Sequence, residues 1–205
     1  MISINEIFKS ILAGMAIGIA GFVNLNVGGG ILGAVLFAFG LLAVVSQGLW
    51  LFTGMAHKVW RRGHNELLTI LALNFLGCLI VASVVATGHV TESAEAIIAT
   101  RAKIGPLKCG LLSIGCGFIM TTAVRGAYGG NWWPLLFGVP VFIMCGFPHC
   151  VADAFYICSC SSDFLKENAL GVILSYIAIV PGNYIGCNLY RFTLLAGKDS
   201  TARFS

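Results

Sequence analysis

Charged side chains are scarce in this chain of 205 residues: only 10% of them are Asp, Glu, Lys or Arg, whereas 58% are hydrophobic. A soluble domain carries roughly 25% charged residues, so a soluble fold is excluded. The net charge is only +4, and we expect no nucleic-acid partner. Together with a mean hydropathy of +0.93, this deficit of charge predicts an integral membrane protein.

Metal-binding and disulfide patterns are also lacking, although the chain has eight cysteines. Most of them lie in apolar stretches, where we expect reduced thiols that pack as small hydrophobic side chains. Cys158 and Cys160 do not have the spacing of a zinc ribbon or a redox pair, and no second pair completes a site. We therefore expect no metal and no cofactor. A cleavable signal peptide is not indicated either, so the first apolar stretch is expected to be retained.

Apolar stretches make up most of the chain, and six are long enough to cross a bilayer, which takes roughly 20 helical residues. They cover about residues 7–27, 31–55, 67–87, 108–124, 133–157 and 169–195. The second, fifth and sixth are longer than a plain helix needs. They contain Gly48, Gly146 with Pro148, and Pro181 with Gly182, which predicts helices broken partway through the membrane. We expect one transmembrane domain over residues 1–205.

Basic residues are unevenly distributed between the two sides that these six stretches define. With the N-terminus inside, the inner segments hold Lys9, Lys58, Arg61, Arg62, Arg125, Arg191, Lys198 and Arg203. The outer segments hold Arg101, Lys103, Lys108 and Lys166. Inner segments of membrane proteins are enriched in Lys and Arg, so both termini are predicted to be cytoplasmic.

A short motif occurs twice, as Asn74-Phe75-Leu76-Gly77 in the third stretch and Asn183-Tyr184-Ile185-Gly186 in the sixth. Each copy follows a broken stretch with a polar residue just after its break, Thr53 or His149. Three crossings reverse the direction of the second copy, so the pattern indicates an inverted repeat with a site near the bilayer midplane. The alternative is a chance recurrence in which the small residues serve helix packing.

Five segments resemble the formate/nitrite transporter family, in order and in spacing: SILAGMAIGIAG, GAVLFAFGLLAVVSQGLWLFTG, LNFLGC, FIMCGFPHCVADAF and VPGNYIGC. The LFTG after the second stretch and the GFxH within the fifth are the most specific parts. The resemblance implies an all-α, aquaporin-like fold with six spans per protomer and a homopentameric assembly. It also implies one pore per protomer for small monovalent anions such as formate, nitrite or hydrosulfide.

The resemblance further implies which residues line the pore. Apolar constrictions map onto Phe37, Leu41, Leu51 and Phe142, which composition alone would assign to ordinary helix packing. His149 would face Thr53 across the pore, with Asn183 as a further polar partner.

His149 is the only one of the four histidines that lies deep within an apolar stretch. An ionisable side chain near the bilayer midplane usually has a function, and the surroundings of a histidine decide its charge near neutral pH. It could donate a proton to the anion, so that a neutral acid crosses the constriction, or offer an N–H without releasing the proton. The alternative is a neutral imidazole that is hydrogen-bonded between helices.

Two residues depart from the family pattern: Asp153 stands where asparagine is usual, and Pro148 where glutamate is frequent. A carboxylate four residues from His149 could share one helical face with it. We therefore interpret His149 and Asp153 as a coupled titrating pair, in which the carboxylate raises the imidazole pKa or holds a proton itself. An ionised Asp153 that faced the pore would repel anions.

The family also has a vestibule lysine before the fourth span, and Lys103 is our candidate for attracting anions. Both Arg101 and Lys103 precede Gly110 at a shorter distance than in the family, so the register is open. The alternative for Lys103 is an ordinary solvated loop charge.

These observations predict a membrane channel or transporter for small monovalent anions, surrounded by lipid in the inner (plasma) membrane, and not an enzyme. The first alternative is a channel for a small neutral solute or an undissociated weak acid, which Asp153 and the apolar constrictions would also suit. The second is a membrane redox subunit, for which one buried histidine is too few ligands. The third is a purely structural protein, and the position of His149 between apolar residues argues against it.

Overall fold

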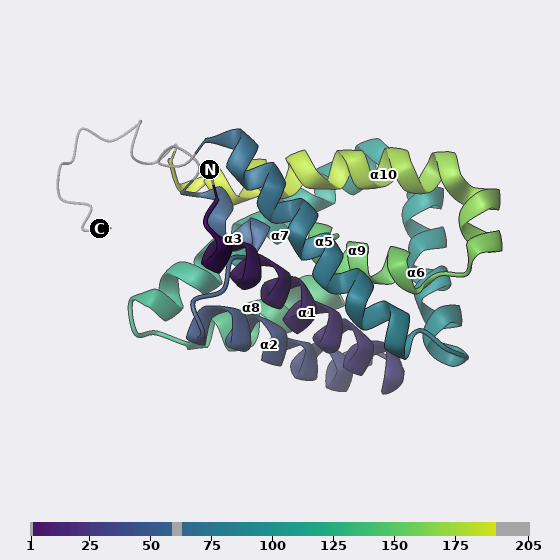
Figure 1. Cartoon of the computed structure of the whole chain (residues 1–205), viewed down its shortest axis with the longest axis horizontal. Helices are drawn as coiled ribbons and strands as arrows, with labels where there is room; N and C mark the ends of the chain where they lie inside the picture. The colour runs from purple at the N-terminus through teal and green to yellow at the C-terminus, as the bar shows by residue number, and fades with distance from the viewer. Residues whose placement is uncertain (1, 59–62, 192–205) are drawn as a thin grey trace.

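The computed structural model describes residues 2–58 and 63–191, and all of its regular elements in these ranges are helices (Figure 1). They are α1 (Ile4–Asn26), α2 (Gly30–Ser46), α3 (Phe52–Ala56), α5 (His64–Val85), α6 (His89–Ile104), α7 (Pro106–Tyr128), α8 (Trp133–Met144), α9 (Cys150–Ser159) and α10 (Ser162–Asn188). Within the described ranges, four helices are long and apolar enough to cross a membrane: α1, α5, α7 and α10. Helices α2, α8 and α9 are apolar but shorter.

Two non-helical segments of the same length separate pairs of these shorter helices. Residues 47–51 lie between α2 and α3, and residues 145–149 lie between α8 and α9. Each segment turns at a glycine with positive φ, 58° at Gly48 and 66° at Gly146, a conformation that glycine adopts without strain. Each ends in an extended residue, Leu51 or His149, which is the N-cap of the following helix.

The sixth apolar stretch is not broken, so the predicted interruption at Pro181 and Gly182 is wrong. Helix α10 is continuous from Ser162 to Asn188 with Pro181 inside it. It begins after the N-cap Ser161, whose side chain accepts a hydrogen bond from the Phe164 N–H, rather than near residue 169. The predicted end of this stretch, residues 192–195, lies outside the described residues.

Helix α6 was not among the predicted elements, and it lies at the end of the molecule away from the start of α1 (Figure 1). It connects α5 to α7 between Gly88 and Gly105, and it packs against α9 and α10. Its sequence, HVTESAEAIIATRAKI, is amphipathic: Val90, Ala94 and Ile98 are buried, while acidic and basic residues occupy its two ends. The charged residues of α6 lower its mean hydropathy below that of a membrane-spanning stretch, so the sequence did not single it out.

Glycines bring the long helices into close contact in two pairs, α1 with α5 and α7 with α10. A Cβ at any of four glycines would overlap a backbone carbonyl oxygen of the partner helix. The four are Gly14, Gly77, Gly117 and Gly186, and the carbonyls belong respectively to Asn74, Ile11, Asn183 and Ile114. Small residues allow this approach in membrane helices. The two Asn-x-x-Gly motifs therefore lie at equivalent helix crossings.

Asn74 of α5 satisfies the backbone at the first interruption. Its Oδ1 accepts a hydrogen bond from the Phe52 N–H at 2.8 Å. Its Nδ2 donates to the carbonyl oxygens of Ser10, at 2.7 Å, and Trp50, at 2.9 Å. The side chain thus joins α1, the non-helical segment and the first turn of α3.

Asn183 of α10 makes the same set of bonds at the second interruption. Its Oδ1 accepts from the Cys150 N–H at 2.7 Å, and its Nδ2 donates to the carbonyl oxygens of Ser113, at 2.9 Å, and Pro148, at 3.0 Å. Both asparagines are fully buried. Backbone groups released from a helix in an apolar interior need such partners, because unpaired groups there cost several kcal/mol.

One thiol on each of the long helices α5 and α10 contacts the short helix at the interruption that the other long helix supports. Cys78 of α5 lies 3.3 Å from the carbonyl oxygen of Val151 in α9, and Cys187 of α10 lies 3.3 Å from that of Thr53 in α3. Helix α5 therefore contacts the interruption that Asn183 supports, and α10 contacts the one that Asn74 supports.

The glycine crossings predict a position-specific loss of stability. Replacing Gly117 with Ala places a methyl group on the backbone of Asn183, which the helices relieve only by separating. We expect the unfolding temperature of the purified protein in detergent to fall, with a free-energy cost of about 1–3 kcal/mol for the overpacking. The control is Gly54→Ala, whose Cβ would meet only the Leu51 Cβ at 3.8 Å. Equal stability of the two variants would contradict this packing.

The hydrogen bonds of the Asn183 side chain predict a second loss of stability. In Asn183→Leu, the Cys150 N–H and the Pro148 carbonyl lose their partner in a buried site, and we expect a cost on the order of 3 kcal/mol. Hydrogen exchange checks the location, because the first turn of α9 should lose protection before the rest of the helix. The matched control on the same helix is Asn168→Leu, which removes only a bond from Nδ2 to the Phe164 carbonyl. Similar exchange in both variants would show that Asn183 does not support α9.

Candidate functional site

The ends of the two interruptions bring a hydroxyl and an imidazole together in the interior. Thr53 is in the first turn of α3, and His149 is the N-cap of α9. Thr53 Oγ1 and His149 Nε2 are 3.0 Å apart, and the two residues are 0% and 1% exposed. The family resemblance predicts that these residues face each other across a pore; the structure brings their side chains together, and the pore stays a prediction.

The second ring nitrogen of His149 caps α9. His149 Nδ1 accepts a hydrogen bond from the Ala152 N–H at 3.1 Å, as the side-chain oxygen of Ser or Asn does at other helix N-termini. A ring nitrogen that accepts a hydrogen bond carries no proton. These bonds therefore assign the proton of the neutral ring to Nε2, which donates to Thr53 Oγ1. The hydroxyl proton of Thr53 is not used in that contact.

Aromatic rings lie beside the imidazole. The ring centroids of Phe142 and His149 are 5.8 Å apart, and those of Phe37 and Phe142 are 6.0 Å apart with the planes at 90°. Both phenylalanines are buried, as are the other two predicted constriction residues, Leu41 and Leu51. Leu41 is one turn after Phe37 in α2, and Leu51 is the N-cap of α3. The polar contact is thus buried, with the apolar ring of Phe142 beside the imidazole.

Asn183 lies near this contact, but its side chain bonds to the backbone rather than to the imidazole. Its three hydrogen bonds go to Cys150, Pro148 and Ser113. The predicted role as a polar partner of the ring is corrected accordingly. Asn183 holds the residues on both sides of His149 and so determines where the ring lies.

Asp153 does not pair with the imidazole, so the interpretation of His149 and Asp153 as a coupled titrating pair is wrong. Asp153 Oδ2 accepts a hydrogen bond from the backbone N–H of His149 at 3.0 Å. Its Oδ1 lies 2.9 Å from Arg101 Nε in an ion pair. His149 is extended rather than helical, so the rule that residues four apart share a helical face does not apply to its side chain.

The cation that contacts Asp153 is Arg101. Arg101 Nη1 donates to the Gly146 carbonyl at 2.8 Å in addition to the bond with Asp153. Lys103, the candidate for attracting anions, is exposed near the end of α6, and its role stays a prediction. The burial of Ala94 and Ile98 places Arg101 on the inward face of the helix, because positions i, i+4 and i+7 coincide. Recognition of α6 as an amphipathic helix would have identified this residue.

Basic groups also gather at the opposite end of the molecule, past α3. Burial, with Lys58 and Arg125 nearby, lowers the pKa of His57 to about 4. His57 is therefore neutral at pH 7. Lys58 lies over the ring of Tyr128, with Nζ 4.9 Å from the centroid. Four of the basic residues in the orientation argument, Arg61, Arg62, Lys198 and Arg203, lie outside the described residues.

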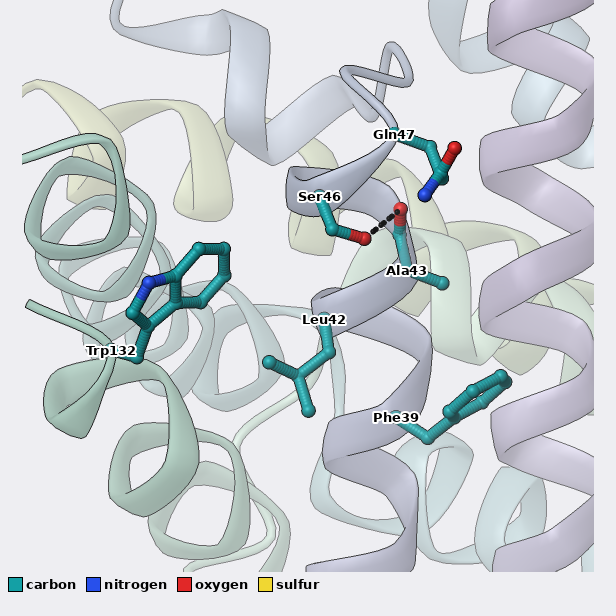
Figure 2. Close-up of a pocket in the computed structure, with 6 residues that line it drawn as sticks. All are labelled: Phe39, Leu42, Ala43, Ser46, Gln47 and Trp132. Atoms are coloured by element: carbon teal, nitrogen blue, oxygen red, sulfur yellow. Dashed lines mark hydrogen bonds between the residues drawn. The ribbon is translucent and has the colours of Figure 1, made fainter. Parts of the chain in front are cut away.

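A hollow of about 600 Å³ lies on the outer side of α2 (Figure 2). It is lined by Phe39, Leu42, Ala43, Ser46, Gln47 and Trp132. Ser46 Oγ bonds to the Ala43 carbonyl of its own helix at 3.3 Å, so the hydroxyl is not directed to a ligand. None of the predicted site residues lines this hollow, and the candidate site remains the enclosed centre.

Comparisons with known proteins bear on the fold and on the family separately. A comparison with curated protein sequences found no match. Among solved structures, a "Pentameric formate channel with formate bound" superimposes with a TM-score of 0.77 at 19% identity, over 94% of this chain and 95% of that one. An "FNT family ion channel" gives 0.74 at 18% identity, over 94% and 90%. These similarities show the fold.

The sequence model of the family described as "Formate/nitrite transporter" matches residues 3–196, which is nearly the whole chain. With its apolar helices, the protein is an integral, multi-pass membrane protein of a family of channels and transporters rather than of enzymes. The chain belongs to the formate/nitrite transporter family.

Proposed function

We propose that this protein is a channel for small monovalent anions such as formate, nitrite or hydrosulfide, with the route passing Thr53 and His149. The observation that supports this most directly is the buried contact between the two polar side chains, which is 3.0 Å long. It lies beside the ring of Phe142, which in turn contacts Phe37. An anion loses its hydration at great cost in an apolar interior. Two donors held at this buried site would offset part of that cost.

The proposed architecture is six crossings arranged as an inverted repeat, in which α2 with α3 and α8 with α9 are the two broken spans. Its support is the equivalence of the contacts in the two halves. Asn74 and Asn183 make corresponding bonds, and the glycines at the two helix crossings contact corresponding carbonyls. The bilayer midplane is then close to the first turns of α3 and α9.

The proposed assembly is a homopentamer with one route in each protomer. It is supported by the similarity over 94% of the chain to a structure described as a pentameric formate channel. The proposed orientation places both termini in the cytoplasm and the protein in the inner membrane, on the basis of the basic residues near the start of α1 and the end of α10.

The hydrogen bonds around His149 favour conduction of the anion itself over proton transfer to it. A neutral imidazole loses its N–H proton only at a pH far above the physiological range. A second proton would have to enter at Nδ1, where the Ala152 N–H already donates, and α9 would lose its cap. In the proposed mechanism His149 and Thr53 therefore offer N–H and O–H donors to the passing anion, and His149 keeps its proton.

His149→Asn tests the site without removing the helix cap, because asparagine is a good N-cap residue but is too short to reach Thr53. We expect formate and nitrite flux into proteoliposomes to fall about 10- to 100-fold, since a hydrogen bond to a charged group contributes about 1.5–3 kcal/mol. The control is His89→Asn, at the exposed start of α6. Unchanged flux in His149→Asn would remove this residue from the route.

The net charge that crosses the membrane with each formate distinguishes passage of the anion from passage of the neutral acid. With equal pH on both sides and a formate gradient, we expect a membrane current and no change in a pH dye trapped inside the vesicles. Clamping the membrane potential should change the rate. If flux is independent of voltage and follows the concentration of undissociated acid as pH varies, the protein is instead a channel for the neutral acid.

A further inference from the structure

Asp153 presents an electrostatic difficulty for an anion route. Its side chain is only 2% exposed, and Oδ2 lies 3.0 Å from the backbone nitrogen of His149, the residue whose ring forms the central contact. A negative charge at this position would repel an anion beside His149, where the low dielectric of the buried site strengthens the repulsion. A buried charge of this kind needs a partner.

Arg101 supplies that partner and extends the contact to the start of the interruption. Nε bonds to Asp153 Oδ1 at 2.9 Å, and Nη1 bonds to the Gly146 carbonyl at 2.8 Å. Its side chain is 13% exposed. The guanidinium therefore spans residues 146–153, from the glycine that turns the chain to the first turns of α9. Such a planar fork fixes the distance between its two acceptors.

The space beside the pair admits no competing anion. A cavity between α6, α9 and α10 is lined by Arg101, Asp153, Ser175 and Tyr176 together with apolar side chains. Its volume of about 10 Å³ is close to the least that one water occupies. Formate or nitrite does not fit on this side. The counter-anion of Arg101 here is therefore Asp153 itself.

We propose that Arg101 and Asp153 form an internal ion pair that holds His149 in place and keeps the interruption between α8 and α9 electrically neutral. This inference rests on the proposed function. Arg101 acts as a positioning residue: it contacts Asp153 and Gly146, and through them it fixes the backbone of His149. It also cancels a charge that would otherwise lower anion selectivity.

Charge compensation predicts an asymmetry between the two partners that simple packing does not. Arg101→Gln leaves a buried carboxylate without a cation, whereas Asp153→Asn keeps an acceptor for the His149 N–H and leaves a cation near the route. In the double variant, Arg101→Gln with Asp153→Asn, no charge remains and the amide oxygen of residue 153 still accepts from His149. The double variant should therefore recover what Arg101→Gln loses.

The experiment compares the wild type with these three variants and Arg101→Lys in proteoliposomes. The readouts are formate flux and the reversal potential in a sodium formate gradient. We expect Arg101→Gln to lower formate flux about tenfold and to shift the reversal potential toward that of sodium. The double variant should return both to within about threefold of the wild type. Arg101→Lys retains the charge but not the planar guanidinium that bonds two acceptors. It should keep the reversal potential and lose part of the flux.

Lys166→Gln is the matched control, because it breaks an ion pair with Asp163 in which both side chains are exposed, at 76% and 89%. We expect no change in flux or potential, as exposed pairs contribute little. Unfolding temperature in detergent is measured for every variant. It should fall further for Arg101→Gln than for the double variant.

The outcomes separate the two proposals. If the wild type conducts and Arg101→Gln conducts with the same selectivity, the ion pair has no such role. If the double variant is as impaired as Arg101→Gln in flux, potential and stability, charge compensation is overturned. If Arg101→Gln does not fold, recovery of folded protein in the double variant supports the pair, and failure of both overturns it. If the wild type passes no anion, the proposed function fails, and the order of unfolding temperatures alone decides on the pair.

Discussion

The structure depends on satisfying the backbone where two helices stop inside an apolar interior. A helix that ends there leaves N–H and C=O groups with no water to bond, which is why irregular backbone at membrane depth is found only where protein or a cavity surrounds it. Asn74 and Asn183 solve this twice with one carboxamide each, in which the oxygen accepts from the new helix and the nitrogen donates to the segment before it. The glycines three residues later let the parent helices approach closely enough for those amides to reach.

This arrangement places one polar, ionisable side chain at a position that otherwise serves only to start a helix. Leu51 and His149 are both extended N-caps after interruptions of equal length. Leucine contributes only an apolar side chain there, whereas histidine both caps its helix through Nδ1 and directs Nε2 toward Thr53. The first role determines the second. Because Nδ1 accepts the capping bond, the proton of the neutral ring is on Nε2, and Nε2 is therefore a donor. Two interruptions of equal length thus end in one apolar and one polar N-cap residue.

The sequence was informative where a polar residue interrupted an apolar stretch. Thr53, His149 and the two asparagines could be singled out because such residues are rare in membrane helices, and the resemblance brought Thr53 and His149 together. The prediction failed where the answer depended on conformation. Asp153 was assigned to the imidazole by helical spacing, but His149 is not helical. Pro181 suggested a break, yet α10 continues through it, and proline is tolerated within membrane helices. The contact of Arg101 with Asp153 could not be predicted, because the helix that directs Arg101 inward was not recognised.

The sulfur contacts have a consequence for how the two halves of the described chain depend on each other. The carbonyl of Thr53 in α3 accepts from the thiol of Cys187 in α10, and the thiol of Cys78 in α5 donates to the carbonyl of Val151 in α9. Each short helix is thus contacted by a long helix from the other half. Neither half has all of its partners when it folds alone, so the two halves complete one another.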